Sequence, residues 1–116
     1  MLDLEEEEEK ASSKIVLLES FVKKRSTLYI YRKRYMELHL VDGQPRLQYF
    51  HASTKNFRAE IKINKTTRAF LMSDSKFEIR GDHETLYFKD PYGHVTCEQW
   101  VQKINEASRI ASRRGS

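Results

Sequence analysis

Hydrophobic and polar positions alternate along most of this chain, and the alternation predicts β-strands. Within a series of short runs, apolar residues recur at every second position, which is the spacing of strands that bury one face. The strongest turn signal between two runs is the segment Asp42–Pro45. Seven strands are expected, at Ile15 to Lys24, Tyr31 to Val41, Arg46 to His51, Arg58 to Ile63, Arg68 to Met72, Lys76 to Arg80 and Glu84 to Lys89. One strand in about every 8–12 residues is typical of an antiparallel sandwich or a small barrel.

The periodicity changes to that of an α-helix near the end of the chain. Thr96 and Gln99 have the spacing of a capping box, in which each side chain hydrogen-bonds the backbone N–H of the other residue. Apolar residues then follow at helical spacing, at Trp100, Ile104, Ala107 and Ala111. The expected fold class is therefore mainly β: a seven-stranded antiparallel barrel or sandwich capped by one C-terminal amphipathic α-helix, with Trp100 in the core.

Length and charge divide the chain into one domain with two tails. A chain of 116 residues has the size of a single domain. Residues 1–14 hold six carboxylates against two lysines, a net of −4, so residues 15–116 carry +8 of the chain's total of +4. We expect residues 1–14 to be an acidic disordered tail, residues 15–111 to be the folded domain and residues 112–116 to be a C-terminal tail. A domain this basic attracts phosphate groups.

Several classes of chemistry are not predicted by this sequence. The single cysteine, Cys97, excludes an intramolecular disulfide and a multi-thiolate zinc site, and the four histidines lack metal-ligand spacing. The sequence contains no catalytic pair, no nucleotide-binding loop and no apolar run of membrane-spanning length. We therefore expect a cytoplasmic protein that is not an enzyme and that uses no metal and no cofactor. Cys97 is expected in the core, although a thiol in a first helical turn can have a lowered pKa.

The second expected strand carries two arginines on its inward face. Residues two apart share one face of a strand, so Arg32 and Arg34 lie in line with apolar side chains. The apolar positions of that face are Met36, Leu38 and Leu40, and the opposite face carries Tyr35, Glu37 and His39. Because unpaired arginines cannot lie deep in a core, Arg32 and Arg34 are expected at an open end of the barrel.

The first expected strand brings a lysine to the same place. Lys24 ends that strand, in phase with the apolar residues Val22, Leu18 and Val16. If the two strands form a hairpin, Lys24 converges with Arg32 and Arg34. Guanidinium groups bind phosphate oxygens in pairs and an ammonium adds a point charge, so the three cations are a candidate phosphate pocket. A merely solvated basic hairpin is the alternative.

Two segments of this hairpin carry a family resemblance. Lys24–Ser26 followed by Arg32–Leu38 is similar to the phosphoinositide-binding pattern of pleckstrin-homology (PH) domains. In that pattern a lysine ends the first strand, and the second strand reads basic-x-Arg-aromatic-apolar-x-Leu. Seven strands and one tryptophan-bearing helix also resemble this family. The resemblance implies that Lys24, Arg32 and Arg34 bind inositol phosphates.

Further positions extend the resemblance, which covers residues 15–111. Tyr49 on the third strand and Arg58 at the start of the fourth stand where PH domains selective for 3-phosphorylated lipids add contacts. Thr85–Gly93, read through to Trp100, weakly resembles the PH domain of phosphoinositide-dependent protein kinases. Phosphoinositide lipids, or inositol phosphates, are therefore the implied ligands, with a preference for 3-phosphorylated headgroups.

The loop between the first two strands departs from the family pattern. Ser26 stands where the family often has glycine, and the loop lacks the additional lysines of strong binders. Its apolar and aromatic residues, Leu28, Tyr29 and Ile30, are candidates for contact with the bilayer interface, where tyrosine is favoured. Structural packing of these three side chains is the alternative.

The sequence as a whole predicts a monomeric membrane-recruitment module, located in the cytoplasm and peripheral to the plasma membrane or to endomembranes. The alternative is a protein–protein interaction module on the same fold, with weak or no lipid specificity. Nucleic acid is not an expected partner. Residues 1–14 are interpreted as a solvated tail, and a further hypothesis is that Glu5–Glu9 competes with lipid for the cationic end of the domain.

Overall fold

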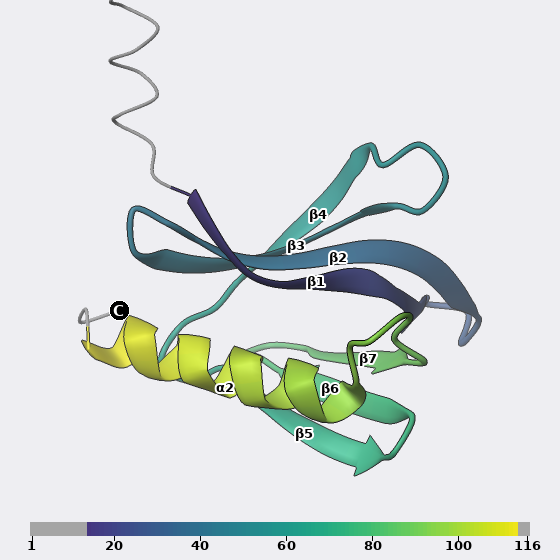
Figure 1. The fold of residues 1–116 in the computed structure, drawn as a ribbon. Helices are drawn as coiled ribbons and strands as arrows, with labels where there is room; N and C mark the ends of the chain where they lie inside the picture. The colour runs from purple at the N-terminus through teal and green to yellow at the C-terminus, as the bar shows by residue number, and fades with distance from the viewer. Residues whose placement is uncertain (1–13, 114–116) are drawn as a thin grey trace, which may run out of the picture.

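The structure, a computed structural model, describes residues 14–113, which form one seven-stranded antiparallel sheet and a C-terminal helix (Figure 1). The hypothesis that Glu5–Glu9 competes with lipid concerns residues outside this range. The elements are β1 (Lys14–Arg25), β2 (Tyr31–Val41), β3 (Gln44–His51), β4 (Phe57–Lys62), β5 (Arg68–Ser73), β6 (Lys76–Arg80), β7 (Thr85–Lys89) and α2 (Cys97–Arg113). The mainly β fold class is confirmed, with strand bounds that differ from expectation by a few residues.

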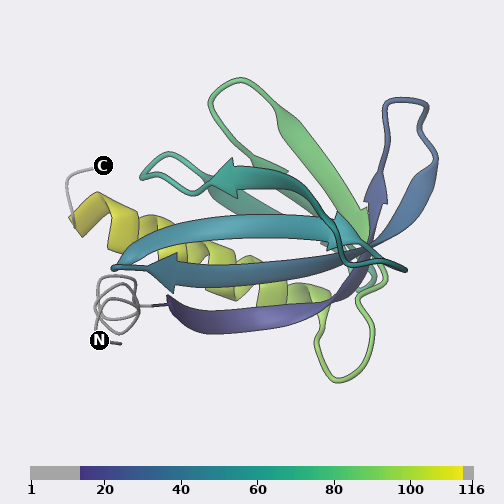
Figure 2. The ribbon, with the colours of Figure 1, turned by 90° about the horizontal axis from the view of Figure 1, so that it is seen from above.

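The sheet folds over at β1, which belongs to both halves of it. The strand order is β4-β3-β2-β1-β7-β6-β5. β1 pairs with β2 along its whole length but with β7 only at Lys23 and Lys24. As a result β1–β4 form one layer and β5–β7 a second layer, with α2 beside the second (Figure 1). Seen from above, α2 runs beneath the layer of β1–β4 (Figure 2).

The core lies between the two layers and is closed by the helix. Trp100 is fully buried and lies parallel to Phe77, with 6.5 Å between ring centroids. Its indole Nε1 donates a hydrogen bond to Ser20 Oγ at 3.1 Å, so the one polar atom of the ring is paired. The capping box is confirmed: Gln99 N donates to Thr96 Oγ1 at 3.1 Å, and Thr96 N donates to Gln99 Oε1 at 2.8 Å.

The expectation that Val16 faces the core is wrong. The register between β1 and β2 shifts between Val16 and Leu18, which marks a β-bulge. The bulge changes the phase of the alternation, so Val16 is 42% exposed while Leu18 packs against the core. From Ser20 onward β1 keeps the expected phase, with Val22 fully buried.

The turn between β2 and β3 is shorter than the segment Asp42–Pro45 suggested. Asp42 and Gly43 both have positive φ, 53° and 82°, as a two-residue hairpin turn with the twist of the flanking strands requires. Gln44 and Pro45 already pair with Val41 and Leu40. Proline is tolerated there because it stands near the beginning of the strand.

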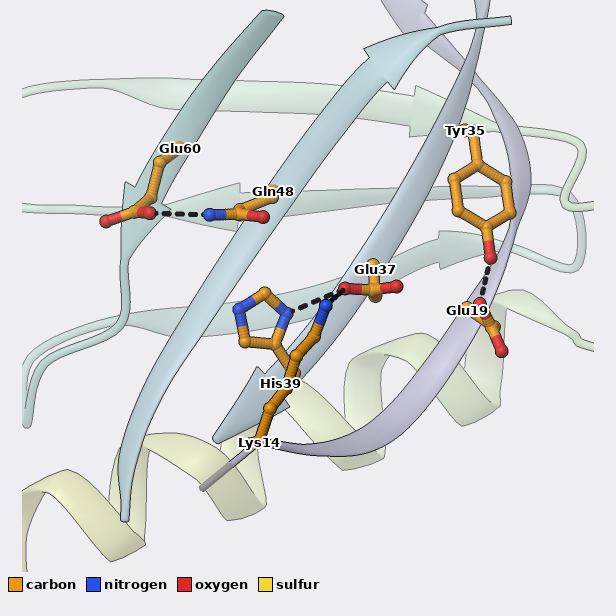
Figure 3. A network of polar contacts seen from close by, with 7 residues as sticks. All are labelled: Lys14, Glu19, Tyr35, Glu37, His39, Gln48 and Glu60. Atoms are coloured by element: carbon orange, nitrogen blue, oxygen red, sulfur yellow. Dashed lines mark hydrogen bonds and ion pairs between the residues drawn. The ribbon is translucent and has the colours of Figure 1, made fainter. Parts of the chain in front are cut away.

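His39 is on the expected face of β2 but is buried, with 2% exposure. Its Nδ1 lies 3.0 Å from Glu37 Oε1, and Lys14 Nζ lies 2.8 Å from the same oxygen (Figure 3). Tyr35 hydrogen-bonds Glu19 on this outer face (Figure 3). Burial lowers the pKa of His39, and the charge of Lys14 lowers it further, against the opposing effect of Glu37. The imidazole is therefore neutral near pH 7.

Two side chains of α2, those of Cys97 and Asn105, contact the rest of the domain. Cys97 is buried, as expected, and burial raises its pKa to about 11, so the thiolate form that a first helical turn can favour is not stabilised. Asn105 hydrogen-bonds the edge strand β5: Ala69 N donates to its Oδ1 at 2.8 Å, and its Nδ2 donates to Ala69 O at 3.1 Å.

Within residues 14–113, no helix is long and apolar enough to cross a bilayer, and no cluster of ligating side chains suits a metal ion.

Candidate anion-binding pocket

One cavity at the open end of the barrel brings together the five site residues that the sequence predicted. Its volume is about 150 Å³. The lining residues are Lys24, Arg25, Ser26, Thr27, Arg32, Arg34, Tyr49 and Arg58. The open end is the end of the β1–β4 layer at which the β1–β2 and β3–β4 turns lie. Side chains from four strands and one loop thus meet at a single site.

Strand pairing explains why the β1 and β2 cations meet. Lys24 pairs with Arg32, and Val22 pairs with Arg34, so the three cations and the buried valine share the inner face of the hairpin. Further along β2, Met36 on the same face is fully buried. The inner face therefore changes from cavity wall to core between Arg34 and Met36, as the alternation predicted.

A bulge at the far edge supplies the fourth cation. Tyr49 pairs with Ala59 and Phe50 pairs with Phe57, so Arg58 is the additional residue of β4 in that register. Bulges redirect a side chain, and this one accompanies the entry of Arg58 into the cavity lining beside Tyr49. The sequence predicted Arg58 from the family resemblance, and the bulge is the local reason for its position.

The hydrogen bonds of Lys24 and Arg34 go to backbone carbonyl oxygens rather than to carboxylates. Arg34 Nη1 donates to the carbonyl oxygen of Lys33 at 2.9 Å, and Lys24 Nζ donates to the carbonyl oxygen of Arg25 at 3.4 Å. Lys24 Nζ also lies 5.2 Å from the centroid of the Tyr49 ring, a cation–π distance. Among the described residues, no ion pair involves any of the four predicted cations.

The pKa shifts at the cavity record burial first and the crowding of positive charge second. Burial lowers the pKa of Lys24, the positive charge of Arg34 lowers it further, and Glu84 partly opposes both. Burial also lowers the pKa of Arg34, followed by the charges of Arg58 and Arg32. Burial raises the pKa of Tyr49, against the opposing effect of Arg58, so the phenol stays protonated and can donate a hydrogen bond. A bound anion would relieve the repulsion among these cations.

The β1–β2 loop beside the cavity exposes its apolar side chains. Leu28 is 72% exposed, Tyr29 75% and Ile30 49%, so half or more of each residue is open to solvent. Ser26 closes the loop: Ser26 N donates to Ile30 O at 2.8 Å, and Tyr29 N donates to Ser26 O at 3.0 Å. Tyr29 has a φ of 64°, a conformation uncommon for a residue with a side chain.

Three further lining residues, Arg25, Ser26 and Thr27, were not predicted. The guanidinium carbon of Arg25 lies 3.8 Å from the centroid of the Tyr87 ring and 4.8 Å from that of Tyr29. Because residues alternate between the faces of a strand, Arg25 is expected on the face opposite Lys24, so the alternation of β1 gave no reason to place Arg25 in the cavity. Its position at the end of β1, where pairing stops, was the only available signal.

Comparisons with known proteins identify the family. A family model described as "PH domain" matches residues 7–112. The fold is similar to the crystal structure of the carboxyl-terminal PH domain of pleckstrin, with a TM-score of 0.59 and 16% sequence identity, covering 87% of this chain and 100% of that one. No curated protein matches the sequence. The chain therefore belongs to the PH domain family, whose members are signalling modules that commonly bind lipids or proteins.

Proposed function

We propose that this domain binds phosphoinositide headgroups and thereby recruits the protein that contains it to membranes. The observation that carries the proposal is the convergence of Lys24, Arg32, Arg34 and Arg58 on one cavity, where none of them forms an ion pair with a described residue. Phosphate groups supply the negative charge that this cluster lacks, and guanidinium groups bind them bidentately. The role is binding, and it requires no catalysis and no cofactor.

A preference for 3-phosphorylated headgroups is part of the proposal. Tyr49 on β3 and Arg58 on β4 line the same cavity as Lys24 on β1, whose Nζ lies 5.2 Å from the centroid of the Tyr49 ring. A headgroup phosphate between these residues and the β2 arginines would accept hydrogen bonds from a phenol and a guanidinium. Cations from β1, β2 and β4 around one cavity favour a ligand with more than one phosphate group.

The exposed loop residues Leu28, Tyr29 and Ile30 support peripheral attachment to a bilayer. They stand next to the cavity, and tyrosine is favoured at the membrane interface. In this proposal the domain acts as a monomer at the cytoplasmic side of the plasma membrane or of endomembranes, with the loop in the interface and the headgroup in the cavity.

A protein-binding role is the second candidate, and one surface favours it. The edge strand β5 exposes Phe70, Leu71 and Met72 at 39%, 46% and 56%. Exposed apolar residues on an edge strand are suited to pairing with a peptide strand. A partner that binds there would be captured equally well by a domain that has lost its pocket cations.

The test is a titration of the folded chain with soluble inositol phosphates that differ at the 3-position, followed by amide NMR shifts. Saturable shifts at Lys24, Arg32, Arg34, Tyr49 and Arg58 are expected, and Arg34→Ala should abolish them. Lys33→Ala, which removes the adjacent charge from the opposite face, is the matched control and should leave binding unchanged. No saturable shift with any inositol phosphate would overturn the proposal and favour the protein-binding role.

A further inference from the structure

The inner face of β7 ends in a carboxylate. Side chains of a strand alternate between its two faces, and Phe88 and Leu86 take the inner face of β7. Phe88 is fully buried, and Leu86 packs against the core. Glu84 stands two residues before Leu86, so it continues the same face just beyond Thr85, the first residue of the strand. A negative charge is therefore aligned with core residues at the end of β7.

Strand pairing places this carboxylate at the open end of the barrel. β1 and β7 are antiparallel, and Lys24 pairs with Phe88 on the inner face. From that pair toward the open end, β1 leads into the β1–β2 loop while β7 leads back to Glu84. The N–H of Gly81 donates to the carbonyl oxygen of Glu84 at 2.8 Å, which closes the β6–β7 turn. Glu84 thus stands at the mouth of the barrel, on the β7 side.

A second cavity beside the pocket has Glu84 in its wall. Its volume is about 220 Å³, and its lining includes Ile61 from β4 and Leu86 from β7. β4 also contributes Arg58 to the pocket, so the two cavities share this strand. The open end of the barrel therefore has the pocket cations on the side of β1, β2 and β4, and the carboxylate of Glu84 on the side of β7.

The charge of Glu84 acts on residues of the pocket. Burial lowers the pKa of Lys24, the charge of Arg34 lowers it further, and Glu84 raises it. Burial raises the pKa of Tyr49, Arg58 opposes that effect, and Glu84 adds to it. Two pocket residues on different strands therefore lie within the field of the same carboxylate. A ligand phosphate between them would lie in that field as well.

Other carboxylates near this end of the domain have partners of their own. Asp82, Glu60 and Asp90 each form a hydrogen bond or an ion pair with another side chain. Their partners are Asn64 and Thr66 for Asp82, Gln48 for Glu60, and Lys23 for Asp90. Among the described residues, Glu84 forms no ion pair. The negative charge of Glu84 is therefore not neutralised by a neighbouring cation, and a bound ligand meets it directly.

We infer that Glu84 is a specificity-determining residue, which admits a headgroup that turns a hydroxyl toward β7 and repels one that turns a phosphate there. The inference rests on the proposed function and deepens it, because it concerns the ligand of the same pocket. A phosphoinositide headgroup keeps free hydroxyls, and one of them can donate a hydrogen bond to the carboxylate. In inositol hexakisphosphate every ring carbon carries a phosphate, so no orientation avoids the repulsion. The domain thus selects lipid headgroups against highly phosphorylated soluble inositol phosphates.

The test measures binding of the full chain to an inositol trisphosphate and to inositol hexakisphosphate by isothermal titration calorimetry at fixed ionic strength. Glu84→Gln removes the charge and keeps the size of the side chain. It should raise the ratio of hexakisphosphate affinity to trisphosphate affinity by about 10-fold. Glu106→Gln is the matched control, because Glu106 is exposed on α2 and does not line the pocket. It should leave that ratio unchanged.

Vesicles that contain a phosphoinositide separate the lipid from the soluble ligand. Inositol hexakisphosphate should displace the Glu84→Gln variant from these vesicles at about a tenth of the concentration that displaces the wild type. The Glu106→Gln variant should be displaced at the same concentration as the wild type. Equal displacement of the wild type and the Glu84→Gln variant would contradict the inference.

The outcomes also separate the two proposals. An unchanged affinity ratio in the Glu84→Gln variant overturns the inference, as does an equal rise in the Glu106→Gln variant, which would indicate a general effect of net charge. In both cases, saturable binding of the trisphosphate by the wild type leaves the proposed function standing. If neither the wild type nor the Glu84→Gln variant binds either inositol phosphate, the proposed function and the inference both fail.

Discussion

Both faces of β2 carry positively charged side chains at the same end of the strand, but the surroundings of these side chains differ. On the inner face, Arg32 and Arg34 line a cavity in which burial, and then the charges of Arg58 and Arg32, lower the pKa of Arg34. On the outer face, Lys33 lies exposed over the rings of Phe21 and Tyr92. One alternating basic run thus places positive charge in a cavity on one face of the strand and on an exposed surface on the other face.

The inner face also differs along its own length. Beyond the arginines, Met36 and Leu38 on the same face are fully buried in the core. The pocket therefore stands directly on the packed interior, and this part of the strand cannot shift without disturbing both.

The largest expected effect tests the core end of that inner face. Leu38→Ala should lower the free energy of unfolding by about 2–5 kcal/mol, because it leaves a cavity among fully buried neighbours. Lys33→Ala, on the outer face, should change it by less than about 0.5 kcal/mol. Urea denaturation of both variants measures the difference. Similar values for the two substitutions would contradict the assignment of the faces.

The second largest effect is expected at the end of the inner face of β2 that lines the pocket. Arg32→Ala should weaken binding of a soluble inositol phosphate about 10- to 100-fold, since a hydrogen bond to a charged group contributes about 1.5–3 kcal/mol. Lys33→Ala removes the same charge one residue away and should have no such effect. Isothermal titration calorimetry compares them at equal ionic strength. If both lose affinity equally, net charge rather than the pocket governs binding.

The smallest expected effect is a pH dependence of stability at His39, which lies on the outer face of β2 away from the pocket. The folded state lowers the pKa of His39 below its usual 6.5, so the unfolded chain takes up a proton first. The stability that the neutral imidazole contributes is therefore present above pH 6.5 and declines as the pH falls below it toward the folded pKa. His39→Gln should flatten this part of the curve of unfolding free energy against pH. An unchanged slope in the variant would show that His39 does not titrate on unfolding.

The sequence predicted the features that depend only on neighbouring residues along the chain, such as the face on which a strand residue lies and the start of the helix. Alternation placed Arg32 and Arg34 on the face of Met36, and the capping box located the start of the helix at Thr96. The convergence of Lys24 with these arginines followed from assuming a hairpin, which the pairing confirms. Whether the pocket binds headgroups stays a prediction.

The features that were missed depend on register shifts and on distant parts of the chain. The bulge after Val16 reverses the face of that residue, and no local signal in the run of apolar residues marks it. The burial of His39 depends on neighbouring strands. The sequence also does not indicate that five aromatic rings lie in a row on the outer face of the β1–β4 layer, because they come from β1, β2, β3, β4 and the segment before α2. The rings are those of Tyr92, Phe21, Tyr35, Phe50 and Phe57.

The clamp of Asn105 on Ala69 has a consequence for the behaviour of the domain at high concentration. β5 is an edge of the sheet, and an edge strand offers a template on which further copies can add, one after another, into a fibril. The carboxamide of Asn105 takes both the donor and the acceptor of Ala69. A side chain of the same molecule thus already occupies the hydrogen-bonding position of this edge at Ala69, so a further strand cannot pair there without displacing Asn105.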